Sequence, residues 1–223
     1  QRQMCIRDSP KHVAISLNGE PTLYTRLSEY MELCHSHGMT TMLVTNGTLP
    51  KVIENLDTLP TQLYVSVDAP NKQVFDQICR PKWNSAAWDK FEETIDLLPS
   101  LDTRIVCRHT LIKGRNMNPE HIPQYAALDN RADPDWIECK GYVHVGNSRE
   151  NLTAENMPFH EDILEFSKAL APLTDRKLLD DSPPSRVALV GKKIVPIPIP
   201  NATMKFPENL GIAESVKHLK IIQ

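Results

Sequence analysis

The 223-residue sequence predicts an α/β protein whose parallel strands form a barrel or part of one. Three observations support this fold class: apolar, β-branched runs recur along the chain, helical periodicities separate them, and the separating segments are long enough for crossover helices. Five consecutive units of this kind imply right-handed connections and a parallel sheet. The predicted strands span residues 12–17, 40–44, 62–67, 104–112 and 135–140.

The first unit changes character within HVAISLNGEPTLY, residues 12–24. An Asn-Gly pair between apolar runs often marks a hairpin, but the apolar residues that follow are spaced for one face of a helix. They are Leu23, Leu27, Tyr30, Met31 and Cys34. We therefore expect a strand, a tight loop and a helix over 25–37 that stops at Gly38. Glu20 then lies at the carboxyl end of a strand, where α/β folds usually place their ligands.

The later units follow the same alternation. A short helix is expected at 52–56 after Pro50, a longer one at 88–98 before Pro99, and another around 122–126. Beyond Gly146 we expect a helix around 163–170 and a last strand within SRVALVG, residues 185–191.

The two ends of the chain differ from the rest. Residues 1–9 have no periodicity and are interpreted as a foreign segment, which leaves 10–191 for the partial barrel. The segment 192–223 contains several prolines near its start, and a strand so interrupted cannot enter the interior of a sheet. We expect it to be a tail.

Composition excludes several classes of protein. A formal charge of −3 argues against a protein coated in basic charge, so a nucleic-acid partner would need a local patch. No apolar run approaches the roughly 20 residues that span a bilayer. The cysteines are odd in number and widely spaced, unlike a secreted disulfide framework. They are Cys5, Cys34, Cys79, Cys107 and Cys139. We expect a soluble, cytoplasmic protein.

Turn motifs follow all five predicted strands: NGEPT, TNGT, SVDAP, IKGRN and KGYVHVG. In a parallel barrel these ends converge on one face, where such folds hold their chemistry. Glycine, asparagine and aspartate also end strands for purely local reasons, and each motif alone is explained equally well in that way. All five together favour a binding site.

The residue types suggest roles within that site. Glu20 is expected to accept hydrogen bonds from an ammonium group, Ser66 and Asp68 to meet sugar hydroxyls, and Gly19 and Gly47 to let a ligand approach the backbone. Glu20 as a helix-dipole acid and Asp68 as a helix N-cap are the simpler alternatives.

Basic residues lie beside the strand-end motifs. A locally basic rim is expected from them, and a merely solvated rim is the alternative. They are Lys113, Arg115, Lys140 and Arg149.

The motifs SLNGEPTLY, LVTNGT, LYVSVDAP, TLIKGRNM and IECKGYVHVGNSRENLTAENMP occur in this order. Over residues 12–190 the set resembles the radical S-adenosylmethionine enzymes that make 4-demethylwyosine in archaeal and eukaryotic tRNA. The Gly-Glu-Pro turn is typical of the radical family at large, and KGYVHVG with the following NSR and ENMP is similar to the wyosine branch. The resemblance implies a partial (β/α)6 barrel of strands two to six, lacking its first βα unit.

The resemblance also implies cofactors and site residues. S-adenosylmethionine and a [4Fe-4S] cluster would lie at the open end of the barrel. The turn Gly19, Glu20 and Pro21 would receive the methionine amino group of the cofactor. The second cofactor loop would be Thr45, Asn46 and Gly47, and the ribose side Ser66 and Asp68.

The implied substrates are pyruvate and N1-methylguanosine of phenylalanine tRNA, with an electron donor as a further partner. A lysine would hold pyruvate, and Lys113, Lys140 and a residue outside this chain all remain candidates. The remaining substrate or tRNA contacts are assigned to Asn116, His144 and Arg149.

One departure from the family is serious. Its Cys-x3-Cys-x2-Cys cluster loop follows the first strand, and this chain begins at what resembles the second. We therefore expect an amino-terminally truncated form without the cluster ligands, unable to assemble the cluster by itself. One alternative is a radical enzyme acting on a small molecule or peptide, which has no need of KGYVHVG. The other is a non-catalytic α/β module that binds only nucleic acid or a nucleotide, which an upstream cysteine triad would exclude.

Overall fold

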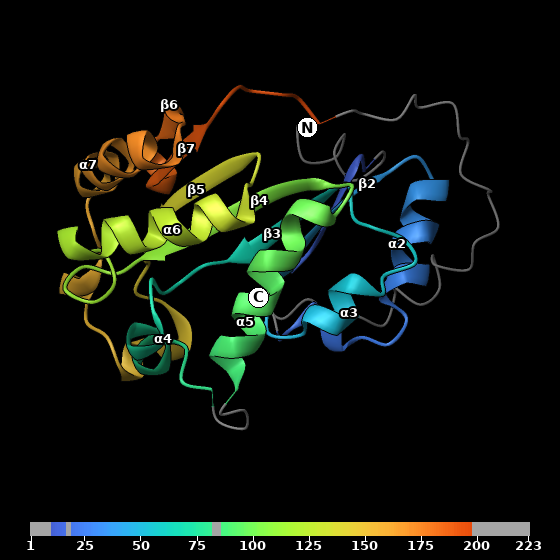
Figure 1. Cartoon of the computed structure of the whole chain (residues 1–223), viewed down its shortest axis with the longest axis horizontal. Coiled ribbons are helices and arrows are strands. Elements are labelled where there is room, and N and C mark those ends of the chain that lie inside the picture. The colour runs from blue at the N-terminus through green and yellow to red at the C-terminus, as the bar shows by residue number, and fades with distance from the viewer. Residues whose placement is uncertain (1–9, 17–18, 82–85, 198–223) are drawn as a thin grey trace, which may run out of the picture.

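The computed structural model describes residues 10–16, 19–81 and 86–197 and contains a curved sheet covered by helices (Figure 1). The strands are β1 (His12–Ile15), β2 (Thr40–Thr45), β3 (Gln62–Ser66), β4 (Arg104–Leu111), β5 (Trp136–Gly141), β6 (Lys177–Ser182) and β7 (Val187–Gly191). Their order across the sheet is β1-β2-β3-β4-β5-β7-β6. The predicted α/β partial barrel is confirmed.

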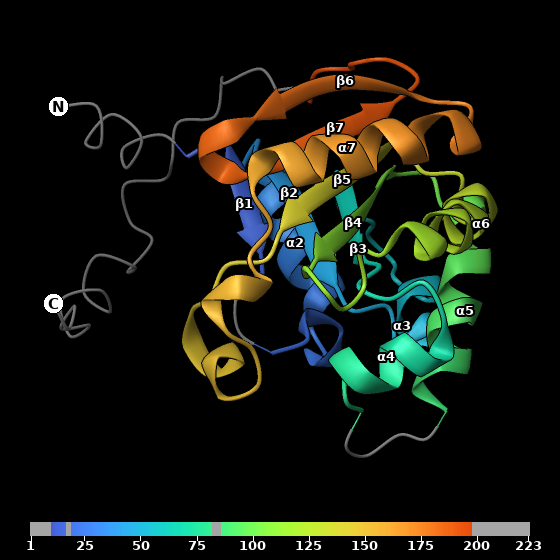
Figure 2. The ribbon, with the colours of Figure 1, turned by 90° about the vertical axis from the view of Figure 1, so that its left-hand side faces the viewer.

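The first five strands are parallel, and the last two are not. β1 to β5 pair in chain order, whereas β7 runs antiparallel to both β5 and β6. Figure 2 shows this final hairpin extending the sheet beside β5. The predicted strand within 185–191 is confirmed, but its partner β6 was not predicted, because KLLDDS has no clear alternation.

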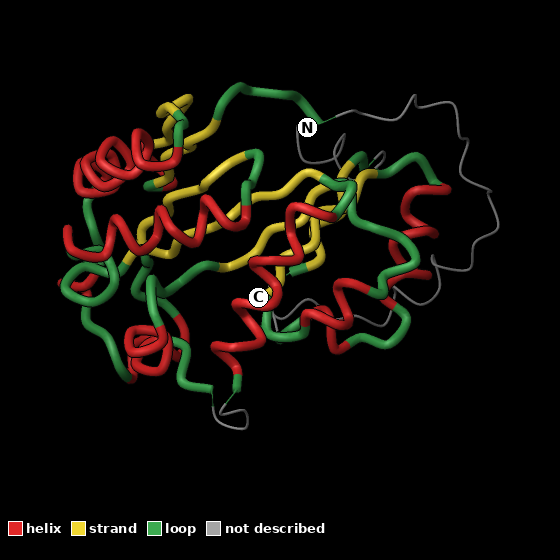
Figure 3. Tube along the Cα trace, viewed as in Figure 1, coloured by secondary structure: helices red, strands yellow, loops and turns green. Residues whose placement is uncertain are grey.

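Helices occupy the connections between the strands (Figure 3). The α-helices are α2 (Leu27–Ser36), α3 (Pro50–Glu54), α4 (Lys72–Ile78), α5 (Ala87–Leu97), α6 (Ile122–Ala132) and α7 (His160–Leu170). The short 3₁₀ helices are η1 (Pro21–Leu23), η2 (Leu98–Ser100), η3 (Pro119–His121), η4 (Gly146–Glu150), η5 (Ala154–Asn156), η6 (Ala171–Thr174) and η7 (Pro183–Ser185). In the described residues, no helix is long and apolar enough to cross a membrane.

The main core lies between the sheet and these helices. Leu63 and Val65 of β3 are fully buried there, and Phe91 and Ile95 of α5 pack in the same cluster. The predicted helical face of α5 is therefore confirmed. Alternate residues of β3, β4 and β5 point to the opposite, concave face of the sheet, and several of them are polar.

The predicted first helix is correct in place but partly wrong in its buried face. Met31 and Cys34 are buried as expected, and Gly38 has a φ of +69° just beyond the end of the helix. Leu23 lies instead in η1 and is 70% exposed, and Tyr30 is 40% exposed. The regular spacing predicted that a helix forms, but it did not predict how much of the helix surface the surrounding elements would bury.

Several predictions concern residues outside the described ranges or need correction. Cys5 and the rest of segment 1–9, together with Leu17, are not described. Helix α4 was missed, since it is short and buries only Val74 and Phe75. The cap of α4 is Asn71, whose side chain accepts from Val74 N, so the N-cap alternative for Asp68 is wrong.

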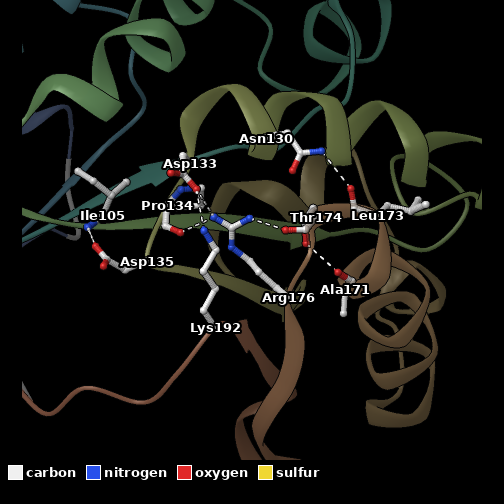
Figure 4. A network of polar contacts seen from close by, with 10 residues as sticks. All are labelled: Ile105, Asn130, Asp133, Pro134, Asp135, Ala171, Leu173, Thr174, Arg176 and Lys192. Carbon is white, nitrogen blue, oxygen red and sulfur yellow. Dashed lines mark hydrogen bonds and ion pairs between the residues drawn. The ribbon is translucent and has the colours of Figure 1, made fainter.

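A polar network closes the amino-terminal end of the sheet (Figure 4). The guanidinium of Arg176 is buried and donates to Thr174 O at 2.7 Å, Pro134 O at 2.7 Å and Asp133 Oδ1 at 2.9 Å. Lys192 also reaches Asp133, at 3.6 Å. These bonds join the loop before β5 to the loop before β6.

The first residues of the predicted tail contact the amino-terminal ends of strands β4 and β5. Arg104 donates to Val195 O at 2.7 Å and Pro196 O at 3.0 Å, and Trp136 Nε1 donates to Lys193 O at 2.9 Å. The segment adds no strand within the described residues, in agreement with its prolines.

Candidate functional site

Glu20 joins the first two strand-end loops. Its Oε1 accepts from Thr22 N at 3.1 Å, Thr22 Oγ1 at 2.7 Å and Thr45 Oγ1 at 2.6 Å, and its Oε2 accepts from Asn46 N at 2.8 Å. The carboxylate thus caps η1 and also holds the second loop. Oε2 carries a single bond from the described residues, so it can still accept a donor from a ligand.

Glycines give these two loops their shape. Gly19 has a φ of +74°, and no described atom other than those of its chain neighbours lies within 4 Å of the position its Cβ would take, so there is open space beside this residue. Gly47 has a φ of +70°, and a Cβ there would lie 3.2 Å from Val65 Cγ1 and 3.3 Å from Phe91 Cδ2. Gly47 is therefore required by both its conformation and its packing.

We expect Gly47→Ala to lower the free energy of unfolding by about 1–3 kcal/mol, because alanine is strained at positive φ and its Cβ would crowd the core. Gly114→Ala is the matched control, since Gly114 has a φ of +71° and free space where a Cβ would stand. Urea unfolding of both variants measures the difference. Equal losses would show that crowding at Gly47 is negligible.

Asp68 is held beside the end of β4. Its Oδ1 accepts from Thr110 N at 3.1 Å, and its backbone oxygen accepts from Asn116 Nδ2 at 2.8 Å. Burial raises the pKa of Asp68 from its usual range. Asn116 is itself fully buried and bonds Thr110 O and Ile112 N as well, so it braces this loop. Its predicted contact with substrate stays a prediction.

The concave face carries a charged row below these loops. Ser66 of β3 is in register with Arg108 of β4, which is in register with Glu138 of β5. Arg108 Nε donates to Glu138 Oε1 at 2.8 Å, and its guanidinium carbon lies 4.5 Å from the ring centroid of Tyr64. This pair gives the interior of the partial barrel a polar, charge-balanced wall.

The two candidate lysines have different surroundings. Lys140 is half-buried on β5 two residues after Glu138, in register with Thr110, and none of the described residues bonds its ammonium group. Lys113 is about half exposed, lies 3.2 Å from Asp162 and sits over the ring of Phe159. Lys140 therefore lies on the concave face beside the row of Ser66, Arg108 and Glu138, which we call the interior row, whereas Lys113 lies at the rim.

The loop after β5 is stabilised by its own polar side chains. Tyr142 OH lies 3.1 Å from His144 Nδ1 and donates to Ser148 Oγ at 2.8 Å. Arg149 is exposed and donates to His144 O at 3.3 Å. His144 and Arg149 thus share one loop at the rim, next to the hydrophobic side chains of Val143 and Val145, which are exposed.

The described cysteines do not fit a cluster. Among residues 10–16, 19–81 and 86–197, no three His, Cys, Asp or Glu side chains are grouped so that they could hold a metal. Cys107 and Cys139 are fully buried, and desolvation raises the pKa of Cys107 well above its usual value and that of Cys139 to about 12. A cluster ligand must be a thiolate, which such burial opposes. That the ligands lie outside the chain stays a prediction.

The chemistry of the Glu20 and Asp68 loops is compatible with S-adenosylmethionine, and their role as its binding site stays a prediction. Open space lies beside the Cβ position of Gly19, and the carboxyl groups of Glu20 and Asp68 follow β1 and β3, the strands on either side of β2. These residues were named from the sequence, whereas Arg108, Glu138 and Tyr64 were not. The available signal was that polar residues alternate on strands β3 to β5, although parallel strands are usually apolar on both faces.

Family models match two parts of the chain. A model described as radical SAM superfamily matches residues 3–126, and one described as wyosine base formation matches residues 131–192. The first covers more than half of the chain. Its range contains the Glu20 and Asp68 loops, and the second contains Lys140 and the loop after β5.

Curated relatives carry the name S-adenosyl-L-methionine-dependent tRNA 4-demethylwyosine synthase. The Pyrococcus abyssi protein is 44% identical over 81% of this chain and 53% of its own length. The Methanocaldococcus jannaschii protein is 44% identical over 81% of this chain and 56% of its own length. The chain thus spans about half the length of the archaeal relatives it matches.

Solved structures agree with the fold. A structure of TYW1 with a lysine-pyruvate adduct bound matches 82% of this chain and 57% of that chain, with a TM-score of 0.74 and 42% identity. A domain of a pyruvate-formate lyase-activating enzyme from Bacteroides vulgatus matches with a TM-score of 0.55 at 16% identity over 73% of this chain and 94% of that one, a likeness of fold alone.

Proposed function

Because the chain belongs to the radical SAM superfamily, in the branch of the tRNA 4-demethylwyosine synthases, we propose that it forms the cofactor- and RNA-binding part of such an enzyme. The complete enzyme would convert N1-methylguanosine of phenylalanine tRNA and pyruvate into 4-demethylwyosine. The observation that carries the proposal is the Glu20 carboxylate, which joins the GEP and TNG loops at the carboxyl edge of a parallel sheet.

We assign the residues of the chain to the following tasks. Glu20 Oε2 accepts from the ammonium of S-adenosylmethionine, and Asp68 accepts from its ribose hydroxyls with Ser66 beside it. Gly19, Pro21 and Gly47 shape the turns against which the cofactor lies. S-adenosylmethionine, together with a [4Fe-4S] cluster, supplies the radical chemistry when bound. An electron donor and a cytoplasmic location complete the proposal.

Lys140 is the better placed of the two lysines to hold pyruvate. Its amine would add to the ketone carbon of pyruvate and release water, forming a C=N bond, and its position in the interior row keeps that bond beside the cofactor loops. Lys113 is already engaged by Asp162 at the rim. A lysine in the half of the relatives that this chain does not span is the alternative.

The proposal is tested with a longer protein, which contains this chain and the additional regions that its relatives have. Anaerobically reconstituted, and given N1-methylguanosine tRNA, pyruvate, S-adenosylmethionine and a reductant, it should form 4-demethylwyosine, detected by mass spectrometry of the digested tRNA. Cofactor cleavage with no change in tRNA would contradict the assignment.

We expect Lys140→Ala in that protein to abolish the pyruvate adduct trapped by borohydride, because no other described lysine lies on the interior row. Lys113→Ala is the matched control and should retain the adduct. Intact-mass measurement after reduction gives the answer. An adduct that survives both changes would exclude both lysines as its site and leave the rest of the proposed function standing.

A further inference from the structure

A hollow of about 550 Å³ lies next to the cofactor loops and has no role in the function proposed above. Its walls come from the end of α4, the turn after β4 and the segment 147–152. The Figure 1 view shows α4 and the segment after β5 on the same side of the sheet. The hollow is large enough for one nucleotide, since small-molecule sites have volumes of about 300–1,000 Å³.

The hollow is connected to the candidate site by direct bonds. Ile112 lines it, and its backbone N–H donates at 2.6 Å to Asn116, the residue that also holds Asp68. Cys79 lines it too, and the pKa of that thiol is raised by desolvation and, to a smaller extent, by the charge of Asp68. A molecule in the hollow would therefore lie beside the predicted ribose-binding loop.

Two arginines give the hollow an excess of positive charge. Arg80 and Arg115 both line it and are exposed. Neither guanidinium forms an ion pair with a described residue. Arg80 donates only to the backbone oxygen of Gln77 among them, and it has a φ of +47°. Glu150 is the one acidic residue of the lining. Unpaired guanidinium groups are suited to bind phosphate oxygens, often through two parallel hydrogen bonds.

The rest of the lining suits a base rather than a bare anion. Ile112 and Leu152 offer apolar surface, and Asn147 and Asn151 offer amides that both donate and accept hydrogen bonds. Unpaired RNA bases are recognised by this combination of stacking surface and edge-directed hydrogen bonds. S-adenosylmethionine carries no phosphate, and its only anionic group is a single carboxylate.

We propose that this hollow binds one unpaired nucleotide of an RNA substrate, with Arg80 and Arg115 on its phosphates and the asparagine amides on the edge of its base. The proposal rests on the proposed function for the identity of the RNA. It goes further by assigning the place where the RNA enters and the residues that hold it. An enzyme that modifies a base must act on it outside the base stack, so it needs a site at the rim that holds an unstacked nucleotide.

The first experiment measures binding of a fluorescent RNA hairpin with an unpaired purine-containing loop to the 223-residue chain. Arg115→Glu should weaken binding at least about tenfold, because a charge-assisted hydrogen bond to phosphate is lost. The salt dependence should become less steep by about 0.7 in its log-log slope for that single-strand phosphate. Arg115→Lys should recover part of the affinity.

Lys177→Glu is the matched control. Lys177 is exposed and begins β6, in register with Gly191, at the opposite end of the sheet from the hollow. The change in charge is the same, so general electrostatic attraction falls equally in both variants. Urea unfolding of Arg115→Glu should match that of the unchanged chain, since the described residues make no bond to its side chain.

The second experiment uses Cys79 as a reporter inside the hollow. Cys79 is an exposed residue that lines the hollow. Partial desolvation of its thiol, with Asp68 and Asp76 adding to it, raises its pKa to about 12. Its slow alkylation by excess maleimide is followed by peptide mass spectrometry with and without the hairpin. The hairpin should slow alkylation of Cys79 severalfold, and S-adenosylmethionine should leave the rate unchanged.

The outcomes separate this proposal from the proposed function. Equal affinities of Arg115→Glu and Lys177→Glu, protection of Cys79 by S-adenosylmethionine alone, or no binding of the hairpin by the unchanged chain would each overturn it. A hairpin that binds through Arg115 while the longer protein leaves N1-methylguanosine unchanged would uphold the RNA site and overturn the proposed reaction instead.

Discussion

Glu20→Ala should weaken S-adenosylmethionine binding by about 2–5 kcal/mol, the cost of truncating one partner of a buried, hydrogen-bonded charge pair. Two effects combine in this loss. The ammonium group of the cofactor loses its carboxylate acceptor, and Thr22, Thr45 and Asn46 lose the oxygens that hold two loops together. Anaerobic equilibrium titration of the longer protein measures the change.

Two further variants separate these effects. Thr45→Val removes one bond to Glu20 and leaves its charge, so a loss as large as that of Glu20→Ala would assign the effect to loop geometry. Glu32→Ala removes an exposed acid from α2 and should leave the affinity unchanged. If Glu20→Ala binds the cofactor as tightly as the unchanged protein, Glu20 is only the cap of η1, which is the helix-end alternative.

Arg176→Ala should lower the free energy of unfolding by about 3 kcal/mol, one of the largest effects expected in this chain. Its buried guanidinium satisfies Thr174 O and Pro134 O, and hydrogen bonds to charged groups contribute about 1.5–3 kcal/mol each. Without it, the loops before β5 and β6 lose their common donor (Figure 4).

Lys192→Ala is the control for the ionic part of this network. Both Lys192 and Arg176 reach Asp133, but that carboxylate and Lys192 are about 60% exposed, so the pair should contribute no more than about 1 kcal/mol. Urea unfolding curves of the two variants give the comparison. Similar losses would mean that the buried backbone acceptors find water when Arg176 is removed.

Local spacing in the sequence determined most of the helices and the five parallel strands. Met31, Phe91 and Ile95 are buried because apolar residues at helical spacing share one face, a property of each segment by itself. The motifs at the strand ends could be assigned to one edge of the sheet for a similar reason, since parallel strands all end on the same side.

The residues proposed for the site were named from the sequence, but their contacts were not. The bond from Thr45 to Glu20 joins residues 25 positions apart, and that from Thr110 to Asp68 joins residues 42 apart. The polar row of Arg108 and Glu138 was missed for the same reason. Each residue is ordinary within its own strand, and the pair exists because the strands are in register.

The sequence by itself determined where strands and helices form and which turns carry the polar motifs, because backbone preference and apolar periodicity are local. Only the tertiary structure decided that β7 pairs antiparallel with β5, that the half-exposed KLLDDS segment becomes strand β6, and that Tyr30 stays exposed. These outcomes depend on which distant segments pack together, and strand pairing and burial gain free energy only when those partners meet.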